Sequence, residues 1–199
     1  MTNLTIIYTL TIRNILTNMK NSIIERELYT IYLLQKYLVS SYIFDIVSYN
    51  KYLTSFNSIS LYLSIVLYYD IYLFIYIILT LTTSRTTNRY IKDYCKKERP
   101  YNRNPGYIQY FIKRKQSYSF PSQSILNISV LYNSIYYYNN VYYENYINST
   151  WFCMISFIYY MLFISLSITR MYRGLHYPHD IIISYLYSIF VVKFIMWLD

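Results

Sequence analysis

The sequence predicts an all-α integral membrane protein with about six transmembrane helices packed in one bundle. Three apolar runs are long enough to cross a bilayer, which takes about 20 residues; they cover residues 61–82, 151–169 and 181–198. The second run carries no charged side chain, so a soluble all-α protein with apolar core helices is the weaker alternative. The chain has 199 residues, of which 55% are hydrophobic, and this length favours a single membrane-embedded domain over residues 1–199.

Three further segments are weaker candidates for membrane helices. Residues 28–48 contain several polar and charged side chains. Residues 124–143 are rich in Tyr, Asn and Ser, and need a protein interior to hide their polar groups. Residues 4–19 form a short run interrupted by Arg13, which either spans the membrane or lies on its surface as an amphipathic helix.

Asp70 is the one charge within the run 61–82. A carboxylate in mid-membrane is costly. It therefore either faces a polar bundle interior or caps a shorter helix that begins after it.

The net charge of +9 is concentrated in one predicted loop. Residues 85–115 hold ten of the 18 basic residues and only two acidic ones. Such a run can bind acidic lipid or nucleic acid, or can simply be solvated. Because the flanking segments resemble membrane helices, we expect a membrane and a lipid as partners, and no nucleic acid.

Composition also limits the cofactor chemistry. The two Cys and two His residues show no metal-ligand spacing, so we expect no metal and no cofactor. The chain has no Ala and only two Gly, Gly106 and Gly174. Since the codons for Ala, Gly and Pro are GC-rich, we interpret this as the mark of an AT-rich coding sequence.

The stretch TRMYRGLHYPHD, residues 169–180, is the strongest candidate for chemistry. Pro178 is expected to open the last helix, because proline is favoured in the first helical turn. Asp180 then lies about one turn after His176, where a carboxylate can hold one imidazole nitrogen and leave the other free to attack. Arg170 can offer a planar cationic fork to a phosphate. An isolated His–Asp pair is more often a structural hydrogen bond. The motifs upstream therefore decide whether this pair is interpreted as catalytic.

Two upstream motifs carry further phosphate-binding groups. Lys92 is followed by six residues and then by Arg99 and Pro100. About twenty residues later, Pro121 and Ser122 precede a helical run. A hydroxyl and free backbone N–H groups at a helix start bind anions well.

These three motifs together resemble those of the type 2 phosphatidic acid phosphatases, membrane lipid-phosphate phosphatases related to the vanadium haloperoxidases. The family pattern is Lys, six residues, Arg-Pro; then Pro-Ser-Gly-His; then Ser-Arg, five residues, His, three residues, Asp. The resemblance covers roughly residues 85–195, with Thr169 in place of the Ser. The middle motif departs from the pattern, because Gln123 replaces the Gly and Ser124 replaces the His.

The resemblance implies a metal-independent hydrolysis of a lipid phosphate. His176 would attack phosphorus to form a phosphohistidine, with Asp180 orienting its ring. The phosphate oxygens would be bound by Lys92, Arg99, Arg170, Ser122 and the backbone N–H of Gln123. The family's middle His donates a proton to the leaving alkoxide, a task worth roughly 10²- to 10⁴-fold that serine performs poorly.

Ser124 therefore leaves two main readings open. One is an enzyme that is weakened by the loss of the general acid and favours substrates with an easy leaving group, such as a pyrophosphate. The alternative is a catalytically impaired protein that binds lipid phosphate on the same fold; a scaffolding membrane protein is a third, weaker reading. Phosphatidate, a sphingoid-base phosphate and an isoprenyl pyrophosphate all remain candidate substrates.

Topology signals disagree with each other. The positive-inside rule draws the basic loop to the cytoplasm. The resemblance implies an active site on the luminal or outer face, in the endoplasmic reticulum or another endomembrane, and we follow it because several of those charges serve the site.

Overall fold

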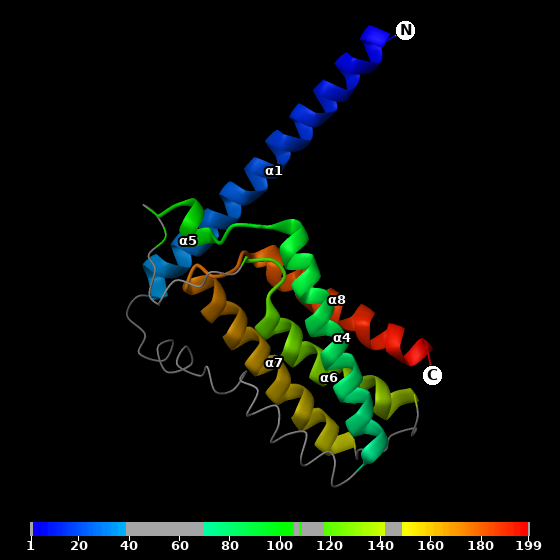
Figure 1. Cartoon of the computed structure of the whole chain (residues 1–199). Helices are drawn as coiled ribbons and strands as arrows, with labels where there is room; N and C mark the ends of the chain where they lie inside the picture. Colours follow the sequence, from blue (N-terminus) through cyan, green and yellow to red (C-terminus); the bar gives the residue numbers. More distant parts are fainter. Residues whose placement is uncertain (1, 39–69, 106–107, 109–117, 142–148, 199) are drawn as a thin grey trace.

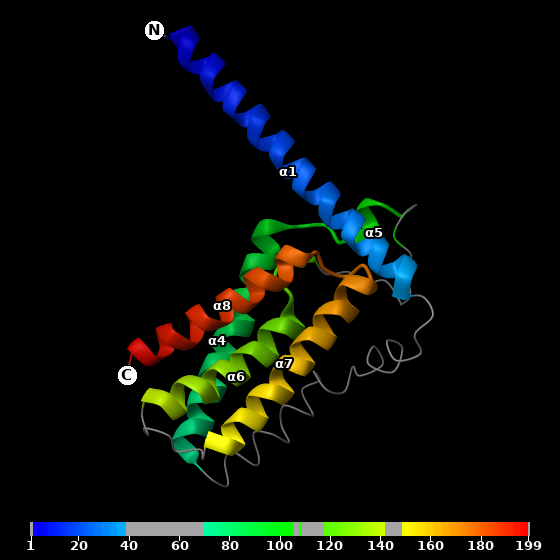
Figure 2. The same ribbon diagram turned by 180° about the vertical axis from the view of Figure 1, so that it is seen from behind.

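The computed structural model describes residues 2–38, 70–105, 108, 118–141 and 149–198, and this part of the chain is helical with short connections (Figure 1). Its helices are α1 (Thr2–Leu38), α4 (Ile71–Cys95), α5 (Pro100–Arg103), α6 (Gln123–Val141), α7 (Ser149–Tyr172) and α8 (Pro178–Trp197). Helix α6 packs against α4, α7 and α8, which makes it the centre of the bundle (Figure 2). The all-α fold class predicted from the sequence is confirmed.

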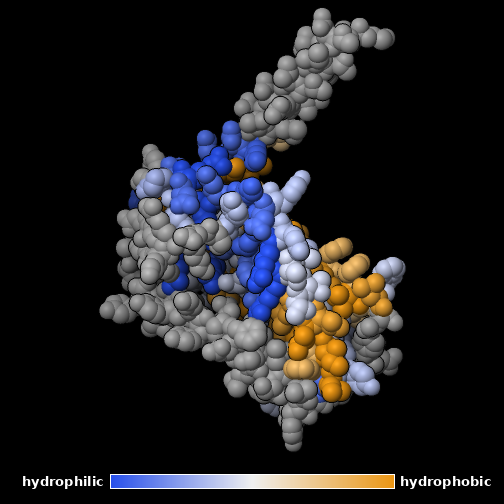
Figure 3. Space-filling model, viewed as in Figure 1, coloured by the Kyte–Doolittle hydropathy of each residue, from blue (hydrophilic) through white to orange (hydrophobic). Residues whose placement is uncertain are grey.

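Helices α7 and α8 are, among the described residues, the two that are long and apolar enough to cross a membrane. Their outward faces carry large exposed apolar side chains, which suits contact with lipid; examples are Phe157, Met161, Leu186 and Phe190. Figure 3 shows hydrophilic residues over the end of the bundle near α5, and hydrophobic residues over the opposite end. The predicted spans 151–169 and 181–198 correspond to these two helices. The predicted count of six spans remains a prediction.

Helix α6 hides its polar side chains inside the bundle, as expected for residues 124–143. Asn133 Nδ2 donates to Ser188 Oγ of α8 at 2.8 Å, and Ser134 Oγ lies 3.0 Å from Thr80 Oγ1 of α4. These pairs satisfy polar groups between helices, where an unmade hydrogen bond would be costly.

Helix α4 resolves the alternatives for Asp70, which is its N-cap. Its Oδ1 accepts from the backbone N–H groups of Tyr72 and Leu73 at 2.8 and 3.1 Å. The Tyr138 hydroxyl donates to its Oδ2 at 2.9 Å. The helix thus starts after Asp70, and residues 61–69 of the predicted span lie outside the described part.

The C-terminal half of α4 corrects the predicted loop 85–115, because the helix continues to Cys95. Threonine hydroxyls in this stretch bond back to carbonyls one turn earlier; Thr87 Oγ1, for instance, donates to the Thr83 carbonyl at 2.7 Å. Such bonds satisfy the polar side chains without breaking the helix. Lys96 ends the helix with a positive φ of 43°. The first part of the basic run therefore lies on a helix.

Helix α1 is continuous through both weak N-terminal candidates, 4–19 and the first part of 28–48; residues 39–48 lie outside the described part. Its first half extends away from the bundle and its second half docks beside α5 (Figure 1). The docked part buries Ile24, Leu28 and Ile31 against residues near α5 and the α7–α8 loop. Gln35 Nε2 also donates to the Tyr172 carbonyl at 2.6 Å.

Candidate active site

The three sequence motifs meet at one end of the bundle, at the loops before α6 and α8. The Tyr118 carbonyl accepts from Lys92 Nζ at 3.2 Å and from Arg99 Nη2 at 3.1 Å. Arg99 Nη1 donates to the Leu175 carbonyl at 2.9 Å. The backbone N–H of Ser122 donates to Ser184 Oγ of α8 at 2.7 Å. Two backbone carbonyls thus fix the cations that the first motif supplies.

A glycine turn after α7 sets the position of the candidate nucleophile. The N–H groups of Gly174 and Leu175 donate to the carbonyls of Met171 at 2.8 Å and Arg170 at 3.0 Å, which is a Schellman cap. Gly174 has φ +61°, and a Cβ there would lie 2.7 Å from Ile108 Cγ2. Only glycine fits this backbone without strain. The turn carries the chain from Arg170 on α7 to His176 before α8.

His176 is buried among positive charges. Burial is the main cause that lowers the pKa of its imidazole well below the ordinary value, and the charges of Arg99, Arg170 and Lys92 lower it further. The ring also hydrogen-bonds to the backbone of Ser119. The side chain is therefore a neutral imidazole at neutral pH, which is the form that can attack an electrophile.

Several buried polar atoms around the three motifs have no hydrogen-bond partner within the part of the chain that the structure describes. They are Ser119 Oγ, Ser122 Oγ, Arg170 Nε and His176 Nδ1, together with Asn88 Oδ1 on α4. Such atoms are rare in folded proteins and call for an explanation. A phosphate oxygen accepts hydrogen bonds from hydroxyl and guanidinium groups, so a bound phosphate would satisfy the Ser and Arg donors of this group.

The contacts of Asp180 differ from the predicted pairing with His176. Its Oδ2 lies 4.0 Å from His176 Nδ1, too far for a hydrogen bond, and accepts instead from the Tyr177 N–H at 3.1 Å as part of a capping box. Its Oδ1 pairs with Lys97 Nζ at 2.6 Å. Proline at the first position of α8, as predicted for Pro178, fixes this helix start. The carboxylate faces the imidazole, but here its stronger partners are Lys97 and the helix N-terminus.

A charged network links this helix start to α1. His179 Nδ1 lies 2.5 Å from Glu27 Oε2, and its backbone N–H donates to Glu27 Oε1 at 3.0 Å. Its other ring nitrogen contacts Lys97 Nζ and lies 3.3 Å from Asp180 Oδ1. Lys97 also lies over the Tyr177 ring, 4.1 Å from its centroid. Sequence reasoning missed this network, because Glu27 and His179 are far apart in the chain and belong to no common motif.

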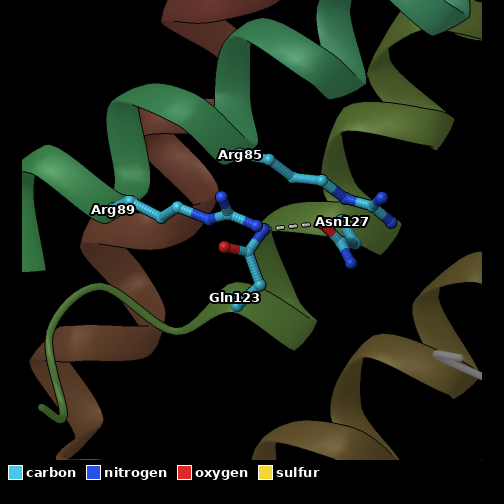
Figure 4. A pocket seen from close by; sticks show the side chains of 4 residues that line it. All are labelled: Arg85, Arg89, Gln123 and Asn127. Carbon is cyan, nitrogen blue, oxygen red and sulfur yellow. Dashed lines mark hydrogen bonds between the residues drawn. The ribbon is translucent and has the colours of Figure 1, made fainter. Parts of the chain in front are cut away.

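The two residues that depart from the family's middle motif, Gln123 and Ser124, lie in the first turn of α6. Ser124 is partly exposed. The side chain of Gln123 points into a cavity that Arg85, Arg89 and Asn127 also line (Figure 4). The Gln123 side chain is therefore not among the predicted phosphate-binding groups. Only its backbone N–H can bind the phosphate, as the resemblance implies.

Comparison with known proteins agrees with the motif pattern. The family model of the PAP2 superfamily matches residues 71–199, which include all three motifs. The chain belongs to the PAP2 superfamily. No curated protein sequence is significantly similar to it.

The fold is similar to that of another PAP2 protein. The crystal structure is that of the transmembrane PAP2-type phosphatidylglycerolphosphate phosphatase from Bacillus subtilis. The TM-score is 0.64 at 16% sequence identity, over 86% of this chain and 85% of that one. Family membership supports a phosphatase of the PAP2 superfamily, and the structural likeness shows that the two proteins share a fold.

Proposed function

We propose that this PAP2 protein hydrolyses a lipid phosphomonoester or pyrophosphate through a phosphohistidine on His176. The observation that carries the proposal is the convergence of three cations on one buried, neutral imidazole; they are Lys92, Arg99 and Arg170. Such a group of cations, held by backbone carbonyls and a helix end, stabilises the negative charge that develops on a transferring phosphoryl group.

The reaction follows from the chemistry of these groups. An imidazole nitrogen of His176 attacks phosphorus, and the bond from phosphorus to the leaving oxygen breaks with its electron pair on that oxygen. Water then hydrolyses the P–N bond, which releases inorganic phosphate and regenerates the imidazole. Asp180 stabilises the imidazolium that forms during attack, once the ring closes the 4.0 Å gap to its carboxylate. Catalytic hydrogen bonds are often long before substrate binds.

The experiment is phosphate release from a panel of lipid phosphates in detergent with a chelator present. Wild type is expected to release phosphate from at least one substrate, and His176→Ala is expected to release none. Acid-labile, base-stable labelling of the protein by a ³²P substrate would identify the phosphohistidine. His179→Ala tests the loss of the other imidazole, because His179 fills an unspecified position of the third motif and has no role in the proposed reaction. Turnover by His176→Ala near the wild-type level would refute the mechanism.

The second candidate is a protein that binds lipid phosphate without cleaving it. It is favoured by Ser124, which stands where the family pattern has a general acid. Binding of lipid phosphate by a wild type that releases no phosphate would select this function.

The luminal or outer position of the active site is part of the proposal. The sequon Asn148-Ser149-Thr150 runs into the first turn of α7, and Arg170 of the proposed site lies in the last turn of that helix. The sequon should stay unglycosylated when the protein is produced in a glycosylating cell. A glycan on Asn148, detected as a mass shift that an endoglycosidase removes, would place the site in the cytoplasm.

A further inference from the structure

A cavity of about 390 Å³ with polar residues in its lining lies between α4 and α6. Four residues line it, two from each helix (Figure 4); they are Arg85, Arg89, Gln123 and Asn127. None of these lining residues carries a carboxylate. The lining offers two guanidinium groups and two amides, so it suits an anion with several oxygen atoms.

On α4 the two arginines of the cavity and Lys92 of the first motif share one face. Arg85, Arg89 and Lys92 are spaced i, i+4 and i+7, so they lie along one face of the helix. With a rise of 1.5 Å per residue, Arg89 lies about 4.5 Å and Arg85 about 10 Å from Lys92 along the axis. On α6, Gln123 follows directly after Ser122. Each wall of the cavity therefore adjoins a predicted phosphate-binding residue, Lys92 on α4 and Ser122 before α6.

A chain of amides fixes the α6 wall. Asn88 Nδ2 donates to Gln123 Oε1, and Gln123 Nε2 donates to Asn127 Oδ1 at 2.7 Å. The acceptor oxygens of Gln123 and Asn127 are thus used within the protein. Asn127 is buried at this wall, and its Nδ2 is left as a donor beside the two arginines. Asn88 Oδ1, at the start of this chain, has no hydrogen-bond partner among the described residues.

The stripe on α4 places positive charge progressively further along the helix from Lys92, with Arg85 partly buried and Arg89 exposed.

We propose that this cavity is a second anion site, which binds the phosphoryl group adjoining the one attacked by His176. This inference rests on the proposed function and narrows its substrate class to lipid diphosphates. His176 would attack the terminal phosphorus, forming the N–P bond while the bridging P–O bond breaks. The electron pair leaves on an oxygen of the lipid monophosphate, which Arg85 and Arg89 neutralise. That leaving group needs no proton when it departs, so the reaction tolerates Ser124 in place of an acid.

The test compares two substrates that share one lipid tail, a monophosphate and a diphosphate. The double variant Arg85→Gln/Arg89→Gln removes both charges and keeps polar side chains. The ratio of kcat/KM for the diphosphate to kcat/KM for the monophosphate is expected to fall at least tenfold. Arg26→Gln/Arg103→Gln, which removes two exposed charges away from the cavity, is the matched control and should keep the wild-type ratio. An unchanged ratio in the cavity variant would overturn the proposal.

Two further measurements keep the proposal separate from the proposed function and from misfolding. Arg89→Lys retains the charge but loses the planar fork, so it should lower the ratio by a smaller factor in a protein that still folds.

Inorganic pyrophosphate should raise the melting temperature of wild type more than inorganic phosphate does, and the double variant should lose this difference. This thermal test holds even if wild type releases phosphate from neither substrate, which would refute the proposed function alone. Equal stabilisation of wild type and double variant would refute the second site. Stabilisation by phosphatidylglycerol vesicles with an unchanged substrate ratio would assign the cavity to a bilayer headgroup and overturn the diphosphate assignment.

Discussion

Replacing Lys97 by Met tests the ion pair that holds the start of α8. Lys97 Nζ lies 2.6 Å from Asp180 Oδ1, and the Asp180 side chain is fully buried. Removing one partner of a buried pair costs about 3–5 kcal/mol, because the other charge stays buried without compensation. Lys97 itself is one-fifth exposed and His179 remains 3.3 Å from the carboxylate, so we expect a loss near 3 kcal/mol. Methionine keeps a side chain of similar length but loses the ammonium that lies 4.1 Å from the centroid of the Tyr177 ring.

For a chain of this size, 3 kcal/mol corresponds to a fall in melting temperature of roughly 6–12 °C. The assay is thermal unfolding of purified protein in one detergent, followed by intrinsic tyrosine fluorescence. Lys96→Met is the matched control, because Lys96 is adjacent, exposed and equally charged. The reasoning is refuted if Lys97→Met melts within 2 °C of this control.

Four other predictions concern the site directly. Arg170→Lys should lower kcat at least tenfold, because an ammonium cannot replace the buried guanidinium fork; an unaffected kcat would exclude Arg170 from the site. Ser124→His should raise phosphomonoester hydrolysis more than pyrophosphate hydrolysis, and no gain on either substrate would mean that the acid comes from elsewhere. Gly174→Ala should destabilise the protein by about 1–3 kcal/mol in a denaturation experiment, because φ is +61° and Ile108 must move. Finally, the lowered pKa of His176 keeps the imidazole neutral as pH falls, so the acid limb of log kcat/KM should lie below pH 6.5 after correction for substrate ionisation; a limb at or above 6.5 would contradict the burial of the imidazole among cations.

The sequence predicted those features that local patterns encode. Apolar runs predicted α7 and α8, and proline chemistry predicted where α8 begins. Motif spacing predicted which distant side chains would meet, because each motif adjoins a helix end on the same side of the bundle. The helical stripe of Arg85, Arg89 and Lys92 was also visible as i, i+4, i+7 spacing, but the run was interpreted as a loop because it is polar and basic.

The remaining features depend on contacts that no local pattern carries. Glu27 reaches His179 only because α1 docks beside the α7–α8 turn, which buries its apolar face there. Asp180 has an expected partner one turn away, yet Lys97 takes its second oxygen, since an ammonium is charged at neutral pH and the buried His176 is not. Which of two side chains pairs with a buried carboxylate depends on distances and burial in the folded protein, and the sequence pattern does not show these.

The turn at Gly174 shows how a biased composition can itself locate function. A coding sequence that drifts toward AT-rich codons replaces glycine wherever another residue can adopt the same backbone, and this chain retains two glycines and no alanine. One survivor stands where φ is positive and Ile108 leaves no room for a Cβ, two residues before His176. In this chain, one of the two glycines therefore marks the turn that positions His176, the candidate nucleophile.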